Sequence, residues 1–72
     1  MTTKELSDIL EEMYKSAEKN EKVTMIHLFG IKYHSQIKEV GIKNIIEQSG
    51  IYSSYHTEIS KGIKLAKYVT AK

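Results

Sequence analysis

Three lysines, Lys61, Lys64 and Lys67, recur every three residues near the end of the chain. A lysine ammonium group binds phosphate as a compact point charge, so this spacing can follow a phosphate backbone. The same three residues can equally form a solvated helix face, as surface lysines commonly do. All eleven cationic side chains of the chain are lysine and none is arginine. Arginine makes the commonest specific contact to guanine, so guanine-specific recognition is disfavoured while phosphate contact is not.

Metal binding and catalysis receive little support from the sequence. The histidines at 27, 34 and 56 include no pair spaced four residues apart, and there is no cysteine to join them. We interpret them as surface or half-buried residues. The chain contains no glycine-rich phosphate cradle, nucleophile elbow or catalytic triad, and 72 residues rarely enclose a deep pocket. We therefore expect no metal, no cofactor and no enzymatic activity.

Charge and composition indicate a small basic protein of the cytoplasm. Residues 1–36 carry five lysines and six acids, whereas residues 37–72 carry six lysines and three acids. The basic excess therefore lies in the second half of the chain. No segment reaches the roughly 18 apolar residues of a membrane span, and the N-terminal residues lack the apolar region of a signal peptide. The absence of cysteine suits a reducing compartment.

Helices must position the lysines, because the chain has no proline and few strand-like alternations. Hydrophobic spacing predicts an all-α fold. The expected architecture is a compact bundle of four or five helices in one domain spanning residues 1–72. We expect the first helix at 3–19, with a capping box between Thr2 and Glu5. The other helices are expected at 21–34, 42–49 and 53–61.

Two segments remain open at this stage. Residues 35–41 either extend the second helix or connect it to the next, and residues 63–72 form a strand, a last helical turn or a dimer arm. Gly30 lies inside the second helix and costs roughly 1 kcal/mol relative to alanine. A close crossing with another helix at that point would offset this cost.

Residues 42–61 satisfy the requirements of a helix-turn-helix, in which two short helices meet at a steep angle across a turn. The inner face of the first helix must be aliphatic, and the turn must contain a residue that tolerates positive φ. An aliphatic residue must then fill the space in the angle between the two helices. The second helix needs a small polar start and an aliphatic anchor. The residues assigned to these roles are Ile45 and Ile46, Gly50, Ile51, Ser53 and Ser54, and Ile59, with Gly62 ending the helix.

This pattern resembles the helix-turn-helix of bacterial repressors of the lactose- and lambda-repressor types. The resemblance covers about 20 of the 72 residues, from Ile42 to Lys61. The stretches "IHLFGIKY" and "SYHTEISKGIKLAKYV" are also similar to a small helix-turn-helix-like module of bacterial and phage proteins. One position departs from the pattern, because an aliphatic residue usually lies three residues before the Ile59 anchor and here it is His56. Tyr55 can turn inward in its place.

The resemblance implies that the second helix enters the major groove of double-stranded DNA. The residues that it places outward as candidate DNA contacts are Tyr52, Ser53, Ser54, Thr57, Glu58, Lys61, Lys64 and Lys67. The hydroxyl groups would contact phosphate or base edges, and Glu58 would accept from cytosine N4.

The implied function is that of a small transcription regulator, acting as a homodimer. Leu65, Tyr68 and Val69 offer apolar side chains for a dimer surface. The alternative is a protein-interaction module of a bacterial or phage accessory or inhibitor protein, built on the same scaffold.

Overall fold

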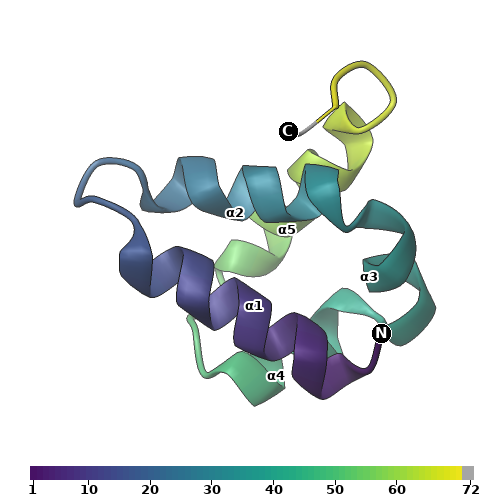
Figure 1. Cartoon of the computed structure of the whole chain (residues 1–72), viewed down its shortest axis with the longest axis horizontal. Helices are drawn as coiled ribbons and strands as arrows, with labels where there is room; N and C mark the ends of the chain where they lie inside the picture. The colour runs from purple at the N-terminus through teal and green to yellow at the C-terminus, as the bar shows by residue number, and fades with distance from the viewer. Residues whose placement is uncertain (71–72) are drawn as a thin grey trace.

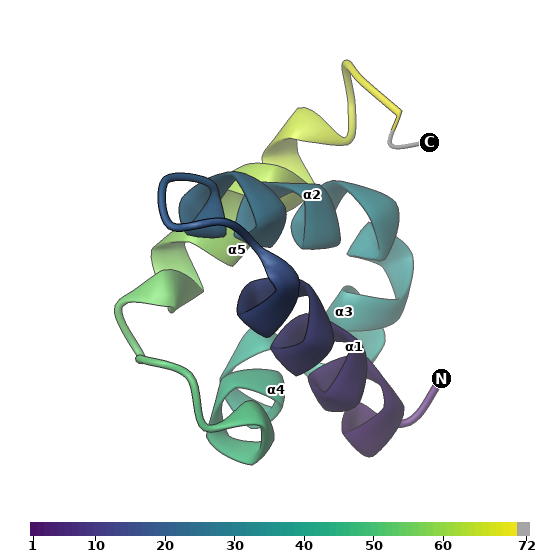
Figure 2. The same ribbon diagram turned by 60° about the vertical axis from the view of Figure 1, so that its left-hand side comes forward.

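The computed structural model describes residues 1–70, which form five helices and no strand within that range. The helices are α1 (Thr3–Ser16), α2 (Lys22–Lys32), α3 (His34–Val40), α4 (Ile42–Ser49) and α5 (Tyr55–Leu65). They enclose one core (Figures 1 and 2). The predicted all-α bundle is therefore confirmed, with five helices rather than four. None of the helices in residues 1–70 is long and apolar enough to cross a membrane.

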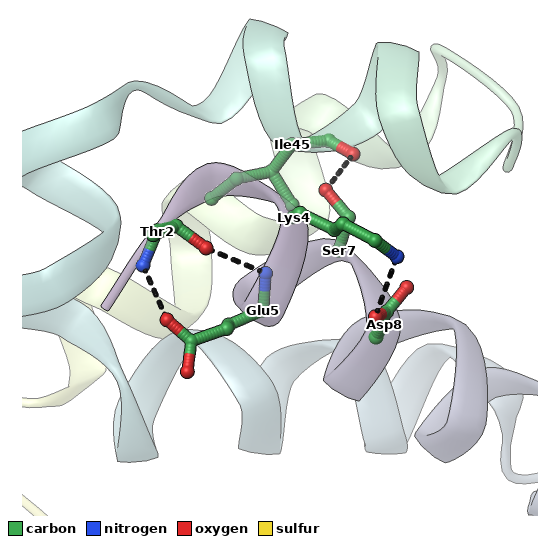
Figure 3. A network of polar contacts seen from close by, with 6 residues as sticks. All are labelled: Thr2, Lys4, Glu5, Ser7, Asp8 and Ile45. Atoms are coloured by element: carbon green, nitrogen blue, oxygen red, sulfur yellow. Dashed lines mark hydrogen bonds and ion pairs between the residues drawn. The ribbon is translucent and has the colours of Figure 1, made fainter.

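Helix α1 begins at the capping box that the sequence predicts. The Thr2 hydroxyl accepts a hydrogen bond from the Glu5 amide at 3.1 Å, and the Thr2 amide donates to the Glu5 carboxylate at 2.9 Å (Figure 3). The helix ends at Ser16, three residues earlier than expected, because Ala17 is extended. The ammonium group of Lys22 donates to the Tyr14 carbonyl at 2.9 Å and so satisfies a carbonyl of the last turn.

The segment expected as one helix over 21–34 contains the helix α2 and the start of α3. The backbone departs from helical geometry at Tyr33, with φ −114° and ψ 23°. The hydrogen bonds nevertheless continue across the break, from the Tyr33 amide to Phe29 and from the Ile37 amide to Tyr33. Residues 35–40 of the ambiguous segment 35–41 thus belong to a separate short helix. Gly41, at φ +90°, then separates α3 from α4.

The core takes side chains from every helix. Its fully or nearly fully buried members are Leu6, Leu10, Ile26, Phe29, Ile37, Ile45, Ile46 and Ile59. Burial of each such side chain contributes about 1.5–3 kcal/mol. Val23, near the start of α2, is 44% exposed and lies outside this core.

A buried serine links α1 to the first helix of the α4–α5 pair. Ser7 is 2% exposed, and its hydroxyl donates to the Ile45 carbonyl at 3.1 Å (Figure 3). The hydroxyl therefore loses its water but keeps a hydrogen-bond partner, as buried polar groups require.

Helices α2 and α5 cross in contact through two glycines. A methyl group added at Gly30 would lie 2.7 Å from the Ile59 carbonyl oxygen, and one added at Gly62 would overlap the His27 carbonyl oxygen. Gly30 therefore lies at a close crossing of the kind that would offset its cost within the helix. The prediction that Gly62 ends the last helix is wrong, since α5 continues to Leu65 and Gly62 lies buried inside it.

We predict that Gly62→Ala destabilises the fold by about 1–3 kcal/mol, because the obstructing atoms are backbone and cannot rotate away. Urea unfolding followed by circular dichroism measures this loss. Thr57→Ala, at an exposed site of the same helix, is the control and should stay within about 0.5 kcal/mol of the parent. Equal stability of the Gly62→Ala variant and the parent would contradict the crossing.

Candidate nucleic-acid interface

The turn between α4 and α5 is built around Gly50 and Ser49. Gly50 has φ +75° and ψ 8°, a left-handed conformation that glycine adopts without strain. The buried Ser49 hydroxyl donates to the Ile46 carbonyl at 3.0 Å, which closes the end of α4. Ile51 follows and packs half-buried against the core. The Gly50 amide also bonds to the Ile46 carbonyl, at 3.1 Å, so two local hydrogen bonds close the end of α4 where the chain turns away.

The second helix of the pair begins later than the sequence pattern indicates. Ser53 and Ser54 were expected to begin it, but they lie exposed in the turn and α5 starts at Tyr55. The Tyr55 amide bonds to the Tyr52 carbonyl and the His56 amide to the Ser53 carbonyl, both at 3.0 Å. The two serines are therefore held in a tight turn that leads into the helix.

The open choice between Tyr55 and His56 is resolved in favour of the tyrosine. Tyr55 packs against the core, with its ring edge-on to Tyr14 at 5.4 Å between centroids and its hydroxyl 3.4 Å from that of Tyr14. This hydrogen bond raises the pKa of Tyr55. His56 is exposed, so its assignment as an inner structural position of the helix is wrong. A tyrosine reaches the half-buried site because its hydroxyl finds a partner there.

Glu58 does not project freely outward as expected. Its side chain is only 24% exposed, and its carboxylate accepts a hydrogen bond from His27 Nε2 at 2.6 Å. Lys61 lies 3.6 Å from its other oxygen. The His27 hydrogen bond holds the pKa of Glu58 below its ordinary value, and the positive charge of Lys61 acts in the same direction, whereas desolvation opposes both. Glu58 is thus used within the fold and is poorly placed to meet a cytosine.

Most of the remaining candidates are exposed and recur every three or four residues along the chain, and we call this row the α5 stripe. Ser54 is exposed in the turn and is not part of it. Along the chain the stripe comprises Ser53, Thr57, Lys61, Lys64 and Lys67. Lys67 lies in turns that follow α5, where its amide bonds to the Lys64 carbonyl. Tyr52 is 72% exposed beside the start of the stripe, with its ring tilted against Tyr55. No acid belongs to the stripe.

Three polar residues of this region escaped the sequence analysis or were misplaced by it. His27 and Ser49 act through partners that only the fold brings near, namely Glu58 and Ile46. The spacing of His56 from Ile59 made it one of two candidates for the inner position, although its polarity was a signal for the opposite face. In the described residues 1–70, no three histidine, aspartate or glutamate side chains gather as a metal site would require.

The fold and this region define a small all-α domain in which a glycine turn joins two short helices, the second bearing a basic exposed face. A family model described as "HTH-like domain" matches residues 2–72, and the chain belongs to that family. No curated protein matched the sequence, and no solved structure matched it. The family supports the helix-turn-helix-like module and leaves the repressor type as a proposal.

We predict that Glu58→Gln lowers the free energy of unfolding at pH 7, because an amide accepts the His27 proton more weakly than a carboxylate. The lowered pKa means that the carboxylate stabilises the fold above its ordinary pKa of about 4.5 and loses this effect as the pH falls through the lowered value. The difference between parent and variant should therefore shrink toward pH 3.

Urea titrations at several pH values between 3 and 7 measure this effect. Glu47→Gln removes an exposed carboxylate of α4 and serves as the control, with little change expected at any pH. A difference for Glu58→Gln that stayed constant across the range would refute the assigned linkage.

Proposed function

We propose that the protein is a small DNA-binding transcription regulator of repressor type that presents α5 to the major groove. The observation that carries this proposal is the α5 stripe, an exposed row of hydroxyls and lysines that contains no acid and follows a left-handed glycine turn. The membership of the helix-turn-helix-like family supports it. The proposal includes a bacterial or phage origin, a cytoplasmic location and no catalytic activity.

The chemistry of the stripe favours phosphate contact over base reading. Lys61 and Lys64 are exposed on α5, and Lys67 continues the row in the following turns. Neutralising about three to five phosphates gives a slope of log affinity against log salt near −3 to −4.5. Hydroxyls of Ser53 and Thr57 add positioning contacts, while the absence of arginine limits guanine readout. Binding by one copy would therefore be weak and only modestly sequence-specific.

A homodimer would raise the affinity by presenting two such helices about one DNA turn apart. The glycine crossing with α2 supports a defined presentation, since it fixes α5 against a helix of the core. The His27–Glu58 hydrogen bond lies at the same contact and holds the Glu58 carboxylate, which keeps its negative charge and lies beside Lys61.

A second candidate function is a protein-interaction module on the same scaffold. It is favoured by exposed apolar side chains at the end of the chain, where Leu65 is 41%, Tyr68 82% and Val69 49% exposed. Such a module would use this apolar end, and the lysines would then be a solvated face. The two candidates differ in whether duplex DNA binds and in how salt affects it.

We predict that the chain binds a mixed-sequence duplex and that affinity falls about 150-fold between 50 and 200 mM salt, as about four phosphate contacts require. Fluorescence anisotropy of a labelled duplex measures this. Lys64→Ala should weaken binding to all sequences and make the salt slope shallower by about 0.9.

Lys19→Ala removes the same charge in the α1–α2 loop and is the matched control, with the slope unchanged. Absence of binding at 50 mM salt, or an affinity that does not change with salt concentration, would refute DNA binding. The protein-interaction module would then be the remaining candidate function.

A further inference from the structure

Two shallow apolar depressions on this small molecule have rims of opposite charge. The first, of about 290 Å³, is lined by His27, Lys61, Lys64, Leu65 and Tyr68, and we call it the lysine-rimmed groove. The second, of about 330 Å³, is lined by Asp8, Ile9, Glu12 and Met13 on α1, and we call it the acid-rimmed face. The accessible lining of both is mainly apolar. We propose that the acid-rimmed face of one copy of the chain docks into the lysine-rimmed groove of another.

The charges of the two surfaces are available for pairing between copies. Among residues 1–70, Glu12 and Lys64 have no ion-pair partner. Asp8 pairs with Lys4 at 3.1 Å, but both side chains are largely exposed, at 64% and 78%. Exposed pairs of this kind contribute little and exchange partners readily. Lys61 is 58% exposed and lies 3.6 Å from Glu58, which leaves its ammonium group open to a second carboxylate.

The spacing of the side chains is compatible with one helix lying on the other. Asp8 and Glu12 are four residues apart on α1, which separates them by about 6 Å along the helix. Lys61 and Lys64 are about 4.5 Å apart along α5 by the same rise. An apolar pair flanks the charged pair on each surface: Ile9 with Met13 on α1, and Leu65 at the end of α5 with Tyr68 in the turn that follows.

A contact between like surfaces is disfavoured. Pairing two lysine-rimmed grooves across a two-fold axis would bring Lys61 and Lys64 against their own copies, and pairing two acid-rimmed faces would oppose carboxylates. Helix α2 lies between α1 and the end of α5 in both ribbon views, so the two surfaces cannot meet within one chain (Figures 1 and 2). The complementary contact therefore joins unlike surfaces head-to-tail, which gives a ring if the rotation closes and otherwise an open chain with one free surface at each end.

Sedimentation of the full chain without nucleic acid, at 50 mM salt and over a range of concentrations up to about 1 mM, tests this arrangement. The average mass should rise above the 8.3 kDa of one copy and continue past two copies. Raising the salt should weaken the association several-fold, because rim charges are screened. A mass of one copy at every concentration overturns the proposal.

A charge swap identifies the surfaces. Asp8→Lys with Glu12→Lys, and separately Lys61→Glu with Lys64→Glu, should each abolish association, while an equimolar mixture of the two variants should restore it. Association of either variant alone at the parent's level, or a mixture that stays at the mass of one copy, overturns the assignment. Circular dichroism of each variant verifies that the helices are retained.

A neutral pair of variants covers the case in which a charge reversal perturbs the fold. Tyr68→Ser changes a side chain that is 82% exposed within the groove and should weaken association several-fold. Tyr52→Ser, at a tyrosine 72% exposed outside it, is the matched control and should not. Equal effects of the two would overturn the groove as the contact. The α1 variants lie outside the α5 stripe and the sample holds no DNA, so failure of duplex binding leaves this test unaffected.

Discussion

The contact between Gly30 and Gly62 is the constraint on which the rest of the structure depends. Because neither residue has a side chain, α2 and α5 approach until backbone atoms touch, and no other residue type fits at either position without displacement of backbone. This approach brings Ile59 into the core beside Phe29 and Ile26. It also brings His27 within hydrogen-bonding distance of Glu58. The direction in which α5 presents its exposed face is thus determined by a helix that lies outside the α4–α5 pair.

The elements that could be predicted from the sequence are those governed by local chemistry. The capping box at Thr2, the apolar spacing of Leu6 and Leu10, and the turn glycine at position 50 each act within a few residues. Helix boundaries were harder to predict. Helix α1 ends where Ala17 becomes extended, and its last turn gains a partner from Lys22, eight residues beyond Tyr14. The break at Tyr33 keeps a backbone hydrogen bond on each side, and neither glycine nor proline stands at that position in the sequence to signal it.

The misassigned positions of the site share a different cause. Glycine serves both as a helix stop and as a contact point between helices, so the composition of "SKG" at residues 60–62 cannot distinguish the two roles. The choice between Tyr55 and His56 depended on a hydroxyl partner, Tyr14, that lies 41 residues away in the chain. The resemblance to repressors placed Glu58 outward, whereas its histidine partner comes from another helix. These interactions are long-range, and periodicity carries no information about them.

The electrostatic character of the molecule follows from how its charges are paired. Helix α1 carries four acids and two lysines, whereas residues 55–70 carry three lysines and one acid. That one acid, Glu58, accepts a hydrogen bond from His27 and lies 3.6 Å from Lys61. The lysines of the α5 stripe are therefore exposed with no unpaired carboxylate among them. Lys61 and Lys64 belong both to this stripe and to the lysine-rimmed groove. One copy therefore cannot offer them to a phosphate backbone and to the α1 of a neighbour at the same time, which makes the two proposed contacts mutually exclusive on any single α5.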